Sequence, residues 1–155
     1  DLSYKINENL IFKNNTSWIE GIDRKTKTPI INIPPLTTKN QIRFSFSKWE
    51  SFFGTINSKF VFSQNKFPNN NFYTTIIENG TKVEKLVDIS TPPDRYHDLG
   101  VDLNWGPYNL FSNKISFSLT FDNILNANYR NYLNRMRFYN DELGRNVMVQ
   151  IKINH

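Results

Sequence analysis

The feature of this sequence that most limits its possible folds is a regular alternation of apolar and polar residues. In residues 113–124, Ile115, Phe117, Leu119 and Phe121 alternate with Lys, Ser, Thr and Asp. A period of two is typical of a β-strand with one apolar face and one polar face. The alternation recurs along the chain and predicts strands at residues 2–6, 10–21, 39–47, 52–65, 96–105, 113–124 and 145–154.

The lengths of these strands and of their connections indicate a particular kind of sheet. After the short first strand, each run has roughly 9 to 14 residues, whereas strands of globular proteins usually have about 5 to 6. A tilted strand needs about 9 to 11 residues to cross a bilayer. The predicted connections alternate between short (7–9, 48–51, 106–112) and long (22–38, 66–95, 125–144). Short turns at one end and long loops at the other are typical of outer-membrane barrels, whereas a Greek-key sandwich places long connections at both ends.

The charged residues within these runs fall on the polar face. The two exceptions, Glu20 and Arg145, lie at strand ends beside long loops. A charge on the lipid-facing side costs about 2 to 4 kcal/mol at the bilayer midplane, so lipid would enforce this distribution. Asn14 and Thr16 interrupt the apolar face without an evident reason. The charged residues on the polar face are Lys13, Lys39, Arg43, Lys59, Asp98, Asp102, Lys114, Asp122 and Lys152.

Composition excludes several other classes of protein. Alanine occurs once and cysteine is absent, which argues against an all-helical protein and excludes disulfides, thiolate metal sites and cysteine nucleophiles. The net charge is +5, but the basic residues are scattered, so we expect no nucleic-acid partner. The two histidines, His97 and His155, belong to no metal-binding or nucleophile motif. We therefore expect no enzyme activity, no cofactor and no metal site.

Aromatic residues gather near the predicted strand ends. Amphipathic rings at both ends of the strands resemble the aromatic girdles at membrane interfaces, although ordinary core and hairpin aromatics are the alternative. The residues concerned are Trp18, Trp49, Phe52, Phe53, Trp105, Tyr108 and Phe111.

The last third of the chain carries a more specific pattern. The segments 121–130 (FDNILNANYR), 132–139 (YLNRMRFY) and 144–147 (GRNV) resemble the C-terminal end of TonB-dependent outer-membrane receptors. Upstream, 32–35 (NIPP) and 98–102 (DLGVD) are similar to the preceding hairpins of that family. The resemblance covers nearly the whole chain, and the Asn-rich, Ala-poor composition is most similar to members from Bacteroidota. The family generally ends on an aromatic residue, where this sequence ends on His155.

The resemblance implies an all-β fold, an antiparallel transmembrane β-barrel. Residues 1–155 would be its C-terminal segment, supplying about six strands of a wall of about 22, while the plug and earlier strands lie outside this sequence. Such a receptor binds a scarce ligand (siderophore-iron, haem, another metal complex or an oligosaccharide) and imports it with energy transmitted by TonB. The expected partners are the remaining strands and plug, TonB through the plug, outer-membrane lipid, and surface or periplasmic proteins. The long loops would be extracellular, and the short turns and C-terminus periplasmic.

The loop at residues 125–144 supplies the candidate ligand-binding residues. Guanidinium and aromatic groups together capture anions by paired hydrogen bonds and stacking. The alternative is that the arginines pair with Asp141, Glu142 and neighbouring loops, and so hold together the loops at this rim of the barrel. The loop at 66–95 contains Asn79-Gly80, which predicts a hairpin between strands 73–77 and 81–87 and a further contact for a ligand or partner. The candidate ligand-binding residues are Arg130, Arg135, Arg137, Tyr132 and Tyr139.

Two other classes of protein share the alternation. A soluble β-sandwich that binds carbohydrate or protein would turn the apolar faces into a dry core. A passive porin or adhesin barrel would have the same strands without a plug or a TonB contact.

Overall fold

The computed structural model describes residues 1–46, 48 and 51–154, and this part of the chain is an antiparallel all-β structure. One short 3-10 helix, η1, spans Arg135–Phe138. Long runs of alternating and β-branched or aromatic residues favour this outcome. The strands are β1 (Leu2–Asn7), β2 (Leu10–Ser17), β3 (Thr37–Ser45), β4 (Phe52–Val61), β5 (Phe72–Glu78), β6 (Thr81–Val87), β7 (Tyr96–Leu110), β8 (Asn113–Asp122) and β9 (Asn146–Asn154).

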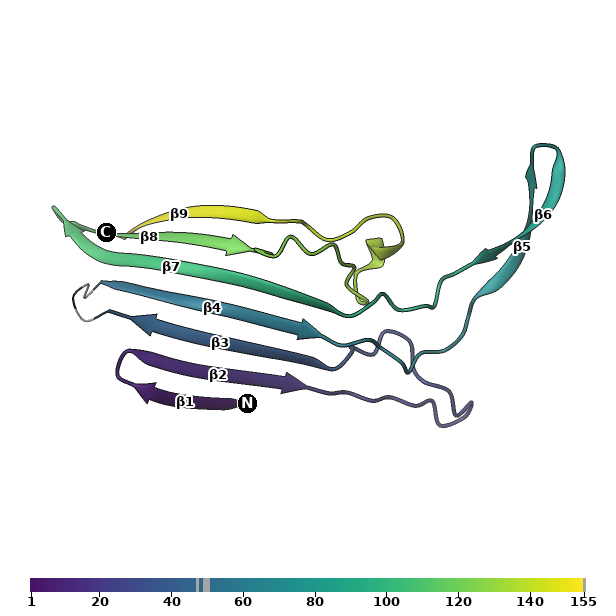
Figure 1. Cartoon of the computed structure of the whole chain (residues 1–155), viewed down its shortest axis with the longest axis horizontal. Helices are drawn as coiled ribbons and strands as arrows, with labels where there is room; N and C mark the ends of the chain where they lie inside the picture. Colours follow the sequence, from purple (N-terminus) through teal and green to yellow (C-terminus); the bar gives the residue numbers. More distant parts are fainter. Residues whose placement is uncertain (47, 49–50, 155) are drawn as a thin grey trace.

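Seven of these strands form one sheet in the order β1-β2-β3-β4-β7-β8-β9, and β5 pairs with β6 alone. The neighbours in the sheet are successive along the chain, apart from the inserted β5–β6 hairpin, so the sheet is an up-and-down meander. Figure 1 shows the β1–β2 and β7–β8 connections as tight turns at one end of the sheet and the long loops at the other end. Among the described strands β1 and β9 are the two edges, and they do not pair with each other.

All the predicted strands are confirmed, but some of their ends differ. β2 stops at Ser17 and not at residue 21, because its last pairing is Ser17 with Thr37. The chain before β3 contains Pro34 and Pro35, which lack the backbone N–H needed to extend the ladder. β4 likewise stops at Val61, which pairs with Tyr96 and Thr37.

The predicted turn at residues 106–112 is wrong in length. β7 continues to Leu110, which pairs with Asn113, and a register shift between Trp105 and Tyr108 absorbs the irregularity. Gly106 lies there with φ of +97°, and a Cβ at this position would come within 2.7 Å of the Ile115 carbonyl oxygen. Only glycine fits so close an approach at positive φ. Gly106 therefore allows β7 to bulge here and to continue its pairing with β8 to Leu110.

The sheet has two chemically different faces. In register, Ile42, Ile56 and Val101 are neighbours across three strands on one face. The charged residues of the seven described strands all alternate onto the other face, which confirms the predicted separation. These residues are Lys5, Lys13, Lys39, Arg43, Lys59, Asp98, Asp102, Lys114, Asp122 and Lys152.

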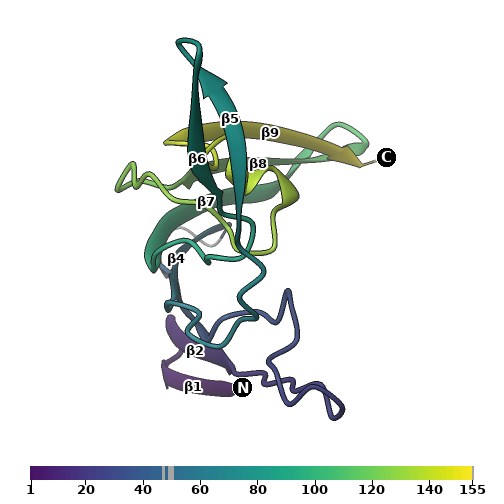
Figure 2. The ribbon, with the colours of Figure 1, turned by 90° about the vertical axis from the view of Figure 1, so that its right-hand side faces the viewer.

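The sheet is strongly curved, and the polar face is its concave side. Figure 2 shows the strands following an arc from β1 and β2 to β9. Polar side chains from strands as distant as β2 and β8, including Lys13 and Asp122, line a single cavity. Such convergence requires that this face curve inward.

The convex apolar face has no second layer over it in the described part of the chain. Val149 is 71% exposed and Ile151 60% exposed. The β5–β6 hairpin does not cover this face, because it stands away from the sheet at the long-loop end (Figure 1). The described strands therefore form a single layer whose apolar side lies open.

A hydrogen-bonded cluster accounts for Asn14 and Thr16, which interrupt the apolar face of β2. The Asn14 amide donates to Oδ1 of Asn40 at 2.7 Å and to Oγ1 of Thr38 at 3.1 Å, and the Thr16 and Thr38 hydroxyls lie 3.0 Å apart. These polar groups satisfy one another across β2 and β3. The cost of placing them on an apolar surface is thereby reduced.

The inserted hairpin is confirmed. Its turn residues Asn79 and Gly80 have φ of +51° and +79°. A two-residue hairpin turn of type I′ requires positive φ at both of these positions. Within the described residues no helix is long and apolar enough to cross a membrane. Trp49, part of the predicted turn at 48–51, and His155 lie outside the described residues.

Candidate binding sites

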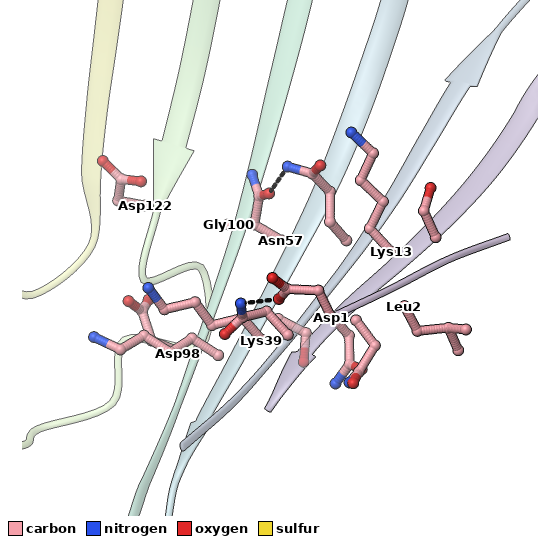
Figure 3. A pocket seen from close by; sticks show the side chains of 15 residues that line it. Asp1, Leu2, Lys13, Lys39, Asn57, Asp98, Gly100 and Asp122 are labelled. Atoms are coloured by element: carbon pink, nitrogen blue, oxygen red, sulfur yellow. Dashed lines mark hydrogen bonds between the residues drawn. The ribbon is translucent and has the colours of Figure 1, made fainter. Parts of the chain in front are cut away.

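A cavity of about 720 Å³ lies against the concave face of the sheet. Small-molecule sites usually measure about 300 to 1,000 Å³, so the cavity has the size of a ligand site. Figure 3 shows the side chains around it, contributed by strands across most of the sheet. The charged lining residues are Asp1, Lys13, Lys39, Lys59, Asp98 and Asp122.

A chain of hydrogen bonds orders the polar side chains beside this cavity. The Gln41 amide donates to Oδ1 of Asn57 at 2.9 Å, and the Asn57 amide donates to Oδ2 of Asp102 at 2.6 Å. The Thr120 hydroxyl donates to the other oxygen of Asp102 at 2.7 Å. The network runs across β3, β4, β7 and β8, and it fixes the Asp102 carboxylate and the two amides in place.

On the concave face, two lysines lie opposite each other, and a lysine and an arginine lie over aromatic rings. Lys39 and Lys59 are direct partners in the register of β3 and β4. The Lys59 ammonium lies 5.6 Å from the centre of the Tyr96 ring, and the Arg43 guanidinium lies 4.1 Å from that of Phe53. Aromatic faces stabilise cations in such positions, so these two side chains are held by rings from their own sheet.

The second candidate site is the loop at residues 125–144, where the sequence predicts ligand-binding residues. Arg130 Nε donates to Asp141 Oδ1 at 2.6 Å. Glu142 accepts from the Asn134 amide at 2.7 Å, and within the described part of the chain it forms no ion pair with an arginine. The Arg130 contact is the one expected if this loop is held together by its own charges.

Arg137 is a structural part of the same loop. Only 6% of it is exposed, and its guanidinium lies 4.3 Å from the Tyr132 ring centre and 4.6 Å from that of Phe138. Its Nη1 donates to the Tyr132 carbonyl oxygen at 2.7 Å. The η1 turn positions it, because the Asn134 side chain caps that turn by accepting from the Met136 N–H.

The structure brings two of the five predicted residues to one cavity. Arg130 and Arg137 line a space of about 350 Å³ together with Asp88, Thr91 and other residues of the loop before β7. Tyr132 is 4% exposed and contacts the Arg137 guanidinium, whereas Arg135 is exposed and Tyr139 is 80% exposed. Arg135 and Tyr139 are not among the residues that line this cavity.

Tyr129 connects this loop to the sheet. Its ring stacks on that of Tyr96, with centroids 4.0 Å apart. Burial raises the pKa of the Tyr129 phenol above its ordinary value, and the nearby Asp98 carboxylate adds to the shift. The raised pKa reflects the partly buried position of this ring between the loop and the sheet.

His97 and Asp98 do not converge, although they are adjacent in sequence. Alternation along β7 sends them to opposite faces, and His97 Nε2 lies 2.9 Å from the Ser58 hydroxyl on the convex side. Among the described residues no group of three or more metal-ligating side chains converges on one point.

The lysines of the concave cavity were not among the predicted site residues. Their sequence signal, a lysine on the polar face of each of three strands, does not reveal which lysines are neighbours. That depends on the register of β2, β3 and β4. No family model matches this chain, and neither a curated protein nor a solved structure is significantly similar to it.

Proposed function

We propose that this chain forms part of the wall of a TonB-dependent outer-membrane receptor, which binds a scarce ligand and imports it with energy transmitted by TonB. The observation that carries the proposal is the chemistry of the two faces. Every charged side chain of the described seven-stranded sheet is on the concave face, and the convex face is uncovered and mainly apolar, with hydrogen-bonded polar groups at Asn14 and His97.

Lipid explains why the convex face can remain uncovered. Apolar surface in water costs about 25 cal/mol per Å², and side chains such as Leu119 and Val149 lie next to each other on this face. Contact with acyl chains removes that cost without a second protein layer. A single misplaced charge would cost about 2 to 4 kcal/mol there, which accounts for the absence of charges from the convex side of the described strands.

The sheet edges support a wall that continues beyond these strands. An edge in lipid leaves backbone N–H and C=O groups unpaired, at several kcal/mol each. β1 and β9 are the first and seventh strands of an antiparallel meander and therefore point in the same direction. Only an odd number of additional strands closes such a wall with antiparallel pairs throughout. A barrel of about 22 strands leaves about 15, which satisfies this condition.

The arrangement of loops is consistent with the direction of import. In the proposed orientation the long loops, including the Arg130 and Arg137 cavity and the β5–β6 hairpin, face outward, and the tight turns face the periplasm. The ligand would be siderophore-iron, haem, another metal complex or an oligosaccharide. TonB would act through a plug, and the specific link to this family is the resemblance of residues 121–147.

Site-directed spin labelling tests the position of the two faces. This sequence contains no cysteine, so single cysteines can be introduced at Leu119 and Val149 on the convex face. Their matched controls are the adjacent residues Ser118 and Gln150, which lie at the same depth on the concave face. The complete gene product that carries this sequence is labelled in the membranes of the cells that make it.

The proposal predicts that the labels at Leu119 and Val149 collide with dissolved oxygen, which partitions into lipid, and that those at Ser118 and Gln150 collide with a water-soluble nickel chelate. Free nickel access to all four labels, or recovery of the protein from plain buffer as a stable monomer, would contradict the membrane position. The TonB contact is tested separately by cross-linking in the same cells. Absence of a TonB adduct would refute energised import while leaving the wall intact.

A further inference from the structure

We propose that Lys13, Lys39 and Lys59 form a binding site for a small oxyanion with two or more negative charges, of the carboxylate or phosphate class. The three lysines lie on adjacent strands, β2, β3 and β4, and all line the concave cavity. Figure 3 labels two of them, Lys13 and Lys39. The site is distinct from the outer-loop cavity of Arg130 and Arg137. The inference extends the proposed function, because a ligand crossing the barrel lumen would pass this face.

The register places the lysines close together. Lys39 and Lys59 are directly opposite each other, and Lys13 is opposite Gln41, two residues further along β3 on the same face. Directly opposed side chains have Cβ atoms about 4.5 to 5.5 Å apart, and like charges there destabilise a sheet. The cluster therefore repels itself and would be neutralised by an anion placed between the ammonium groups.

Within the described residues, none of the three lysines forms an ion pair within 4.0 Å, and the ion pairs present lie elsewhere. They join Lys66 to Glu20 and Arg130 to Asp141. Asp98 is opposite Lys59 in register, but the Lys59 ammonium lies over the Tyr96 ring and forms no ion pair with this carboxylate within 4.0 Å. A ligand anion would thus not have to displace an existing carboxylate from these three lysines.

The carboxylates of the cavity give the site a direction. Asp98 on β7 and Asp122 on β8, which lies next to Gly100, are on one side of the lysines. Asp1 lies on the other side, near β1 and β2, and accepts a hydrogen bond from the Asn15 amide. An anion would bind at β2 to β4, and hydroxyl groups of the same molecule would donate to the carboxylates. Hydroxylated oxyanions therefore fit better than simple ones.

Calorimetric titration of the complete gene product in nonionic detergent tests the site. The probes are citrate, a hydroxylated tricarboxylate, and inorganic phosphate. We expect Lys39→Gln and Lys59→Gln each to weaken citrate binding about three- to tenfold, because each removes one charged hydrogen-bond donor at a partly exposed site. The matched control is Lys152→Gln, on the same face but outside the cavity, which should change the affinity less than about twofold.

A second readout keeps the test independent of folding defects. In the absence of anion, Lys39→Gln should unfold at the same or a slightly higher temperature than the parent protein, because it removes a repulsion between opposed charges. Weaker binding by a protein of unchanged stability supports the site. Stronger binding of phosphate than of citrate identifies a phosphate ligand and overturns the assignment of hydroxylated anions.

Two results overturn the whole inference: neither probe binds, or the control Lys152→Gln weakens binding as much as the cavity variants. Neither outcome affects the spin-label result on which the membrane wall depends. Conversely, anion binding with nickel access to the convex labels would refute the wall and leave this site standing.

Discussion

Replacing Val149 by lysine distinguishes a lipid-facing convex surface from a water-facing one. Val149 lies in the middle of β9, opposite Leu119 on β8, and is 71% exposed in the isolated sheet. If water covers this face, a change at so exposed a position alters the free energy of unfolding by no more than about 0.5 kcal/mol.

If acyl chains cover the convex face, the same change strongly destabilises the folded protein. A lysine near the bilayer midplane costs about 2 to 4 kcal/mol, which lowers the folding equilibrium constant about 30- to 900-fold. The control is Gln150→Lys, one residue further along β9 and on the concave side. It should change the free energy of unfolding by about 0.5 kcal/mol or less.

The assay is equilibrium unfolding in urea of the complete gene product in phospholipid vesicles, followed by tryptophan fluorescence. The expected result is a large decrease in the free energy of unfolding for Val149→Lys and almost no change for Gln150→Lys. Equal and small changes for both variants would refute a lipid-facing β9. Equal and large changes would show that β9 tolerates no lysine on either side, and the two-faced interpretation would then fail.

Three further predictions concern the sheet and its loops. Gly54→Ala should destabilise the protein by about 1 to 3 kcal/mol in urea unfolding, because its Cβ would lie 2.3 Å from the Phe44 ring. Arg137→Lys should increase proteolytic cleavage within residues 125–144, because lysine cannot replace the planar group stacked between two rings; Arg135→Lys, at an exposed position, should leave the cleavage rate unchanged. Asn14→Leu should lower the free energy of unfolding by about 1 to 3 kcal/mol, since it removes the donor to Oδ1 of Asn40 on β3; an unchanged value would show that this cluster is hydrated.

The positions of the strands could be predicted from sequence because alternation is a local signal. Their ends could not, because each end depends on a partner strand. β2 stops at Ser17 since β3 begins at Thr37, a constraint from another part of the chain. Gly106-Pro107 has the composition of a turn, yet the chain bulges there and continues to Leu110.

The candidate sites were predictable only in part. The Arg130 contact with Asp141 agrees with the alternative in which the arginines hold the loop together by ion pairs. No sequence pattern indicates that the Arg137 guanidinium lies over the rings of Tyr132 and Phe138. The lysine cluster depends on the pairing of Lys39 with Lys59 and on the curvature of the sheet. Both depend on the pairing of strands that are distant in the sequence. The residue pattern of one strand therefore does not indicate them.

Fluorescence quenching of Trp105 tests most directly whether the convex face contacts lipid. Trp105 lies on that face, opposite Phe52 and Phe117 and near the tight-turn end of the sheet. The complete gene product is prepared in vesicles with every other tryptophan replaced by phenylalanine. If the convex face contacts lipid, Trp105 should be quenched strongly by lipids brominated near the headgroup end of their acyl chains and weakly by aqueous acrylamide. Strong acrylamide quenching with no effect of the brominated lipids would contradict a lipid-facing convex surface.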